Sequence, residues 1–125
     1  MNNNCIRVLA DPVQIKECKK TLYKLEEQLN LATQIFNLSG NAARLKILFL
    51  LHKEGEMCPC DLSDILDISV GGISQHLRKL KDGKLVKYKK VGQTVFYSIV
   101  EDNIQAIRPV LDSLLNNNNK KESIS

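Results

Sequence analysis

The sequence predicts a mainly α-helical fold that carries one β-hairpin, an α+β architecture, and two observations predict it. Apolar residues recur every three or four positions over most of residues 12–80, as they do on the buried face of a helix. Two short alternating runs, residues 85–89 and 94–99, then flank a glycine-containing segment, as in a hairpin. The 125 residues are enough for one domain with a hydrophobic core.

The first expected helix is long. Asp11 can cap it, Pro12 suits its first position, and Ser39-Gly40 ends it. Its apolar stripe, with alternate spacings of three and four, comprises Ile15, Cys18, Leu22, Leu25, Leu29, Ala32 and Phe36. A helix of this length cannot bury its whole stripe against one small domain, so we expect part of it to meet a second copy of the chain. Residues 1–10, which precede it, are expected to form a flexible arm.

Three shorter helices are expected next, each bounded by residues that cap or break helices. Asn41 caps the first of them and Gly55 ends it. Pro59 opens the second, which is very short. Ser69 caps the third, which ends at Gly83.

A last helix is expected from about Glu101 to Leu115, with Pro109 bending or dividing it. The polar residues 116–125 are expected to be a disordered tail, which leaves residues 11–115 as the folded domain. The order helix, helix, short helix, helix, hairpin, helix is that of a winged helix-turn-helix.

The helix that begins after Ser69 has an outward face made of residue types that contact DNA. Its inward positions are Ile73, Leu77 and Leu80; its outward positions are Gly71, Ser74, Gln75, Arg78 and Lys79, with His76 at the boundary. Gln75 can bond to adenine through both polar atoms of its amide, and Ser74 can reach a base or a phosphate. Arg78 and Lys79 can neutralise backbone charge. The glycines in the first turn leave room for a phosphate at the helix N-terminus.

The hairpin adds a second set of DNA-contacting candidates near its tip: Lys87, Lys89, Lys90, Gln93 and Thr94. Such a tip suits the minor groove or the flanking phosphates. A solvated basic face would explain either element alone, and the net charge of +4 is only mildly basic. Two basic elements in this order favour double-stranded DNA as the partner.

The remaining composition narrows the compartment and the class of protein. The longest apolar run, residues 47–51, is far too short to cross a membrane, and the Asn-rich start carries no targeting segment, so we expect a cytoplasmic protein. In that reducing compartment the four cysteines are expected to bind metal, sense oxidation or be buried, rather than form structural disulfides. The sequence shows neither a base beside the cysteines nor a phosphate-binding loop, so we do not expect an enzyme.

Cys58 and Cys60 lie at the start of the second short helix, where the helix dipole favours the thiolate form that binds soft metal ions. Two thiolates do not complete a three- or four-coordinate site, so a further ligand is needed. Cys5 and Cys18 are the available donors, although Cys18 occupies a stripe position where a cysteine is often only a small buried hydrophobe. His52 is expected to be a surface or capping residue rather than a ligand.

Four segments of the chain resemble the ArsR/SmtB family of metal-responsive winged-helix repressors: residues 40–48, 55–62, 74–80 and 92–98. The resemblance implies a homodimer built on the first and last helices. It also implies a repressor of metal-resistance genes that leaves its operator when a thiophilic ion binds.

The pair Cys58 and Cys60 matches the motif that members of this family use for arsenite, antimonite, cadmium and lead, and mercuric ion also suits two or three thiolates. Arsenite-type members often have a third cysteine where this chain has Ser63. Cadmium- and lead-type members add two cysteines from the N-terminal arm, for which Cys5 and Cys18 are the candidates. The zinc site of the last helix looks absent, because residues 101–115 contain no histidine. The resemblance leaves the ion and the full ligand set open.

A thiol-redox regulator with the same fold is the alternative interpretation. A disulfide within Cys-Pro-Cys would close a very small, strained loop, so we favour the metal-binding interpretation.

Overall fold

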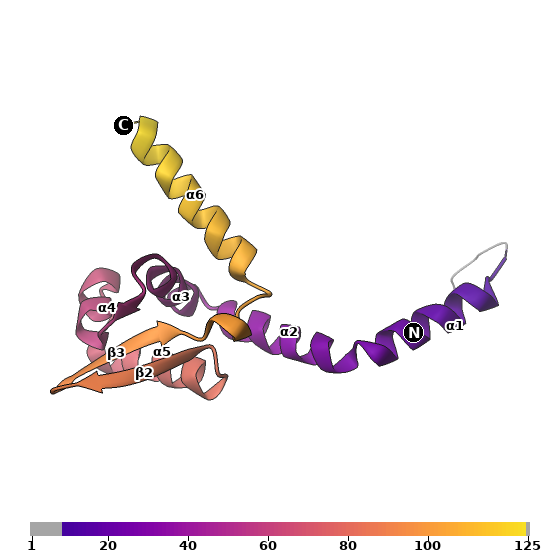
Figure 1. Cartoon of the computed structure of the whole chain (residues 1–125), viewed down its shortest axis with the longest axis horizontal. Helices are drawn as coiled ribbons and strands as arrows, with labels where there is room; N and C mark the ends of the chain where they lie inside the picture. The colour runs from indigo at the N-terminus through magenta and orange to yellow at the C-terminus, as the bar shows by residue number, and fades with distance from the viewer. Residues whose placement is uncertain (1–8, 125) are drawn as a thin grey trace. The chain divides into compact units, whose positions relative to one another are not determined.

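The computed structural model describes the backbone of residues 9–124 and the side chains of residues 9–118. Over this range the chain forms six α-helices, a short 3-10 helix and a three-stranded antiparallel sheet (Figure 1). In chain order the elements are α1 (Pro12–Lys24), α2 (Glu26–Ser39), α3 (Ala42–Glu54), β1 (Glu56–Met57), α4 (Pro59–Leu66), α5 (Val70–Asp82), β2 (Val86–Val91), β3 (Thr94–Ile99), η1 (Glu101–Asn103) and α6 (Arg108–Ile124). The predicted winged helix-turn-helix is confirmed: α4 and α5 form the helix-turn-helix, and β2 and β3 form the wing.

The chain divides into two compact units, Met1–Leu31 and Ala32–Ser125. The first unit contains α1 and the first part of α2, and the second contains the rest of α2 and every later element. Within the described residues no helix is long and apolar enough to cross a membrane.

The prediction of a single long first helix is wrong in one respect, because the helix breaks at Leu25. This residue has φ −97° and ψ 4°, and it separates α1 from α2. Neither proline nor glycine occurs in residues 13–39, so the usual signals give no warning of the break. The break does place Lys24 in the last turn of α1 and Glu26 in the first turn of α2, where each charge is favourable to the helix dipole.

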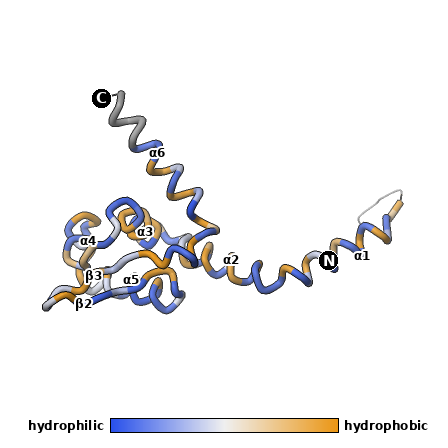
Figure 2. The backbone as a smooth tube through the Cα atoms, in the orientation of Figure 1, coloured by the Kyte–Doolittle hydropathy of each residue, from blue (hydrophilic) through white to orange (hydrophobic). Residues whose placement is uncertain are grey.

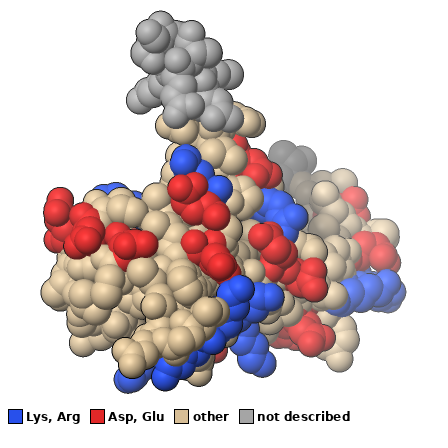
Figure 3. Space-filling view, turned by 60° about the vertical axis from the view of Figure 1, so that its left-hand side comes forward, with Lys and Arg blue, Asp and Glu red and all other residues tan. Residues whose placement is uncertain are grey.

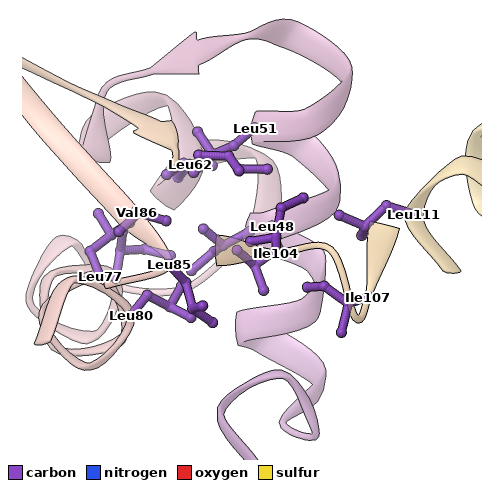
Figure 4. Packing of buried hydrophobic residues seen from close by; sticks show 13 residues of the cluster. Leu48, Leu51, Leu62, Leu77, Leu80, Leu85, Val86, Ile104, Ile107 and Leu111 are labelled. Atoms are coloured by element: carbon purple, nitrogen blue, oxygen red, sulfur yellow. The ribbon is translucent and has the colours of Figure 1, made fainter. Parts of the chain in front are cut away.

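The core of the second unit is built around α3, whose side chains reach the helix-turn-helix, the sheet and the start of α6 (Figure 4). The buried residues are Ile47, Leu48, Leu51, Leu62, Ile73, Leu77, Leu80, Leu85, Val86, Ile99, Ile104, Ile107 and Leu111. Close packing of this kind leaves little freedom for one element to move without its neighbours. The core therefore fixes how α5 and the base of the wing, at Val86 and Ile99, lie relative to each other.

The sheet has one strand more than the sequence predicts. β1 is only two residues long, too short to show an alternating pattern, and it pairs with β3 through Glu56↔Ser98 and Met57↔Tyr97. The strand order is β1-β3-β2. At the tip of the wing, Gly92 has φ +63° and opens a two-residue turn, as in a type II′ hairpin.

The C-terminal helix also differs from its predicted bounds. We predicted a helix from Glu101, but residues 101–103 form a 3-10 turn and α6 begins at Arg108, so Pro109 divides the segment as anticipated. Proline fits the first turn of a helix because that position needs no backbone donor. The helix then continues to Ile124 instead of ending at Leu115, which differs from the disordered tail expected at 116–125. No proline or glycine follows Pro109 to stop the helix.

Candidate nucleic-acid interface and cysteine pair

The helix α5 presents the face that the sequence predicts. The Oγ atom of Ser69 accepts a hydrogen bond of 3.1 Å from the backbone N–H of Gly72 and so caps the helix. The inward residues Ile73, Leu77 and Leu80 are completely buried. The exposed set is Gly71, Ser74, Gln75, Arg78 and Lys79. The predicted DNA-contacting residues of α5 are therefore accessible to a DNA groove, except for His76.

The two glycines at the start of α5 differ in their surroundings. A Cβ atom on Gly72 would lie 2.8 Å from Cγ2 of Ile68, whereas a Cβ atom on Gly71 would meet nothing within 4 Å among the described residues. Packing therefore accounts for Gly72 but gives no reason for Gly71. Close approach of a phosphate would give one.

We expect Gly71→Ala to raise the free energy of unfolding by up to about 1 kcal/mol, because alanine is the better helix former. It should nevertheless weaken operator binding. The matched control Gly72→Ala should lower the free energy of unfolding by roughly 1–2 kcal/mol through its clash with Ile68. Thermal denaturation and DNA titration measure both effects. Unchanged operator affinity in Gly71→Ala would show that no phosphate lies against this residue.

His76 lies at the edge of the exposed face and is half-buried, as predicted. Burial lowers the pKa of its imidazole, and the positive charges of Arg44 and Lys79 lower it further. Arg44 is itself held in place, because its Nε donates a 2.7 Å hydrogen bond to the carbonyl of Leu38. The neutral imidazole is therefore favoured in the free protein, and in that form His76 has one hydrogen-bond donor and one acceptor.

All five predicted wing residues are exposed: Lys87, Lys89, Lys90, Gln93 and Thr94. Strand alternation puts Lys87 and Lys89 on one face and Lys90 on the other. Nζ of Lys89 lies 3.2 Å from Oε2 of Glu56 on β1, so its charge is already partly compensated. Lys87 and Lys90 are then the stronger candidates for phosphate contact. Figure 3 shows Lys and Arg side chains gathered along the lower edge of one face, with Asp and Glu side chains above them.

A tyrosine pair at the base of the wing is a feature that sequence analysis missed. The rings of Tyr88 and Tyr97 lie 5.7 Å apart, and Nζ of Lys81 lies 5.0 Å from the centre of the Tyr88 ring. Burial and the neighbouring Tyr88 raise the pKa of Tyr97, while the charge of Arg78 opposes the rise. The pairing of Tyr88 with Tyr97 could have been predicted, since a two-residue turn at Gly92 fixes the register of the hairpin.

The cysteine pair occupies the start of α4 as predicted. Cys58 is the N-cap residue, with φ −89° and ψ 157°, Pro59 is the first helical residue, and Cys60 is the second. Cys58 is half-buried, Cys60 is exposed, and both thiols are free. One turn later, the hydroxyl of Ser63 donates to the carbonyl of Ile68, so this side chain helps to close the turn between α4 and α5. Two thiols two residues apart at the start of one helix are soft donors of the kind that a thiophilic ion prefers.

The other two cysteines do not belong to the unit that carries this pair. Cys18 is exposed on α1, in the first unit, so its burial as a small hydrophobe would require a second copy of the chain. Cys5 lies outside the described residues. Within the part of the chain that the structure describes, no three Cys, His, Asp or Glu side chains form a metal-binding group.

His52 differs from the surface or capping position expected for it. Its side chain is only 15% exposed, and its Nε2 lies 2.7 Å from Oδ1 of Asp112. The contact joins α3 to α6, so this histidine links two helices of the second unit.

Comparison with known proteins identifies the family. Residues 41–88 match the model described as bacterial regulatory protein, arsR family. A protein of Staphylococcus aureus named cadmium resistance transcriptional regulatory protein CadC homolog is 33% identical over 94 residues, which are 75% of this chain and 76% of the relative. The chain belongs to the arsR family.

Two further comparisons support this result, one over more of the sequence and one through the fold. A transcriptional repressor SmtB homolog of Synechocystis sp. is 29% identical over 111 residues, 88% of this chain and 83% of the relative. The crystal structure of the transcriptional regulator HlyU from Vibrio vulnificus has a TM-score of 0.66 at 32% identity, and the match covers 75% of this chain and 97% of HlyU. The chain is accordingly a DNA-binding transcriptional regulator and not an enzyme.

The arsR-family match begins at Asn41, which caps α3 through a 3.0 Å hydrogen bond from the backbone N–H of Arg44, and ends within β2. It thus contains α4 with its cysteine pair and the whole of α5. The turn of the wing, α1 and α6 lie outside it.

Proposed function

We propose that this arsR-family chain is a homodimeric repressor that releases its operator when a thiophilic metal or metalloid ion binds Cys58 and Cys60. The observation that carries the proposal is the position of these two thiols, at the start of the helix that packs against α5. The names of the relatives support it: one is a cadmium resistance regulator and another a transcriptional repressor. Because its partner is chromosomal or plasmid DNA, the protein would work in the cytoplasm.

In the DNA-bound state, α5 would lie in the major groove. Ser74 and Gln75 would contact base edges, while Arg78 and Lys79 neutralise phosphates. The wing would reach the minor groove or the flanking phosphates through its tip. A dimer would place two such faces on a palindromic site.

Exposed apolar side chains on three helices support the proposal that the chain forms a dimer. Leu22 is 60% exposed, Phe36 is 54% exposed and Leu114 is 40% exposed, although each lies on an amphipathic helix. Figure 2 shows hydrophobic positions recurring along α1, α2 and α6. Helices with such stripes are stable when a partner covers them, so these three elements are the proposed dimer interface.

The ion would be held by the thiolates of Cys58 and Cys60 together with a ligand from Cys18 or Cys5 of the same or the other subunit. Ser63 offers no thiolate and already bonds to Ile68. Arsenite, antimonite, cadmium, lead and mercuric ions all match thiolate donors. The donor set therefore predicts the class of ion, whereas its identity depends on how many thiolates converge.

Two connections join the cysteine pair to the DNA-reading elements. The first is the packing of α4 on α5. The second is β1, which ends at Met57, directly before Cys58, and pairs with Tyr97 of the wing. An ion that moves Cys58 would therefore act on both α5 and the wing. A coupling free energy of about 1–3 kcal/mol between ion and DNA binding would suffice for regulation.

The test is a fluorescence anisotropy titration of the reduced, full-length protein on DNA from the promoter of its own gene. Arsenite, antimonite, cadmium, lead, mercuric and zinc ions are then added in separate experiments. We expect tight DNA binding that one or more of the thiophilic ions reverses. Tight binding that no ion changes would refute metal-dependent release.

The free thiols of Cys18 and Cys60 are exposed, and this favours oxidation as a second candidate signal. The same titration with peroxide in place of metal distinguishes the two. Release by peroxide that a thiol reductant reverses, with no response to metal, would establish the redox function instead.

A further inference from the structure

The wing leaves the three-stranded part of the sheet at one pair of residues. β1 supports β3 only at Ser98 and Tyr97. Beyond Tyr97 the two wing strands pair with each other alone, through Lys89↔Phe96, Lys90↔Val95 and Val91↔Thr94. A two-stranded ribbon is only marginally stable without further support. The pair Tyr88↔Tyr97 is therefore the point about which the wing could bend.

Contacts on both faces of the sheet hold this point. On the face that Tyr88 shares with the buried Val86, the ammonium group of Lys81 lies over the Tyr88 ring at 5.0 Å from its centre. On the opposite face, Lys89 is paired with Glu56 across β3 at 3.2 Å. Lys81 belongs to the last turn of α5, so its contact with Tyr88 joins α5 directly to the wing.

We propose that Lys81 and Tyr88 are positioning residues for DNA binding, which hold the wing at a fixed angle to α5. The inference rests on the proposed DNA-binding face, because a fixed angle matters only if α5 and the wing bind the same duplex. A wing held in place before binding loses less conformational freedom on the DNA, so its contacts contribute more to affinity.

The alternative role for Lys81 is that of a phosphate ligand like its neighbour Lys79. The two roles differ in their salt dependence. A lysine that neutralises a phosphate contributes about −0.9 to the slope of log K against log salt concentration, whereas a positioning residue leaves this slope unchanged. They also differ without DNA, because only a positioning residue restrains the wing of the free protein.

The experiment compares Lys81→Met and Tyr88→Leu with the conservative variants Lys81→Arg and Tyr88→Phe, which keep the cation and the aromatic ring. Hydrogen exchange of the backbone amides of residues 89–96 is measured in the free protein. The operator Kd is measured over a range of salt concentrations. Melting temperatures confirm that the second unit remains folded in each variant.

We expect Lys81→Met and Tyr88→Leu each to speed amide exchange in the wing and to weaken operator binding by about two- to fivefold, the usual strength of an exposed cation–aromatic contact. The salt slope should not change. The double variant should lose no more than either single one, because both remove the same contact. Lys81→Arg and Tyr88→Phe should behave like the wild type.

A smaller salt slope in Lys81→Met with unchanged wing exchange would make Lys81 a phosphate ligand and overturn the proposal. Faster exchange with unchanged operator affinity would also overturn it, since the wing angle would then not matter for binding. If the wild type bound no operator DNA, the proposed function would fail as well. In that case, the exchange data would still show whether Lys81 and Tyr88 restrain the wing.

Discussion

Replacing Cys60 with serine is expected to leave operator affinity unchanged and to abolish release by metal. Cys60 is exposed at the second position of α4, so a smaller hydroxyl fits without disturbing the core. Serine does not supply the thiolate that a soft ion requires. In the wild type the ion should raise the operator Kd about 5- to 150-fold, and in Cys60→Ser this ratio should fall to about one.

Cys58→Ser should give the same result, because both thiols belong to the proposed site. Cys18→Ser is the informative comparison. Loss of release in this variant too would make Cys18 a ligand, and retention would leave Cys5 as the remaining donor. Metal-induced release that persists in Cys60→Ser would contradict the proposed mechanism, whatever the behaviour of Cys18.

The ends of several helices could be predicted because they depend on local chemistry. Asp11, Asn41 and Ser69 each accept a hydrogen bond from a backbone N–H in the first turn of the helix that follows. Gly55, with φ +92°, ends α3 in a conformation that other residues rarely adopt. A residue and its next few neighbours determine such features, so a single sequence reveals them.

Features that depend on distant partners could not be predicted in this way. The two-residue strand β1 exists because Met57 finds Tyr97 across the sheet. The break at Leu25 and the late start of α6 likewise have no complete local signal. The contacts of Lys81 with Tyr88 and of Lys89 with Glu56 cross between elements, so they needed the fold before they could be seen.

The candidate site likewise has parts that local sequence predicts and a part that it does not. The exposed face of α5 follows from the helical period, and the presence of Cys58 and Cys60 at one helix end follows from their spacing of two residues. Completion of the metal site does not follow from either. Cys18 lies in a separate compact unit, and a second subunit could supply it as readily as the same chain. Cysteine variants are therefore needed to identify the thiols that complete the metal site.

Gln75→Ala is expected to weaken operator binding by about 1–3 kcal/mol, or about 5- to 150-fold, and to leave binding to unrelated DNA almost unchanged. Gln75 is exposed in the middle of α5, and its amide can donate to and accept from the edge of an adenine. Alanine keeps the helix and removes only this contact. Anisotropy titrations with operator and scrambled duplexes measure the two affinities.

The matched control is Lys79→Ala, on the same exposed face. Loss of this charge should weaken binding to both duplexes and reduce the salt slope by about one, because a phosphate contact carries no sequence information. Equal losses on operator and scrambled DNA in Gln75→Ala would mean that Gln75 only supports backbone contact. The sequence would then be read elsewhere on α5, with Ser74 the next residue to test, or through the shape of the DNA itself.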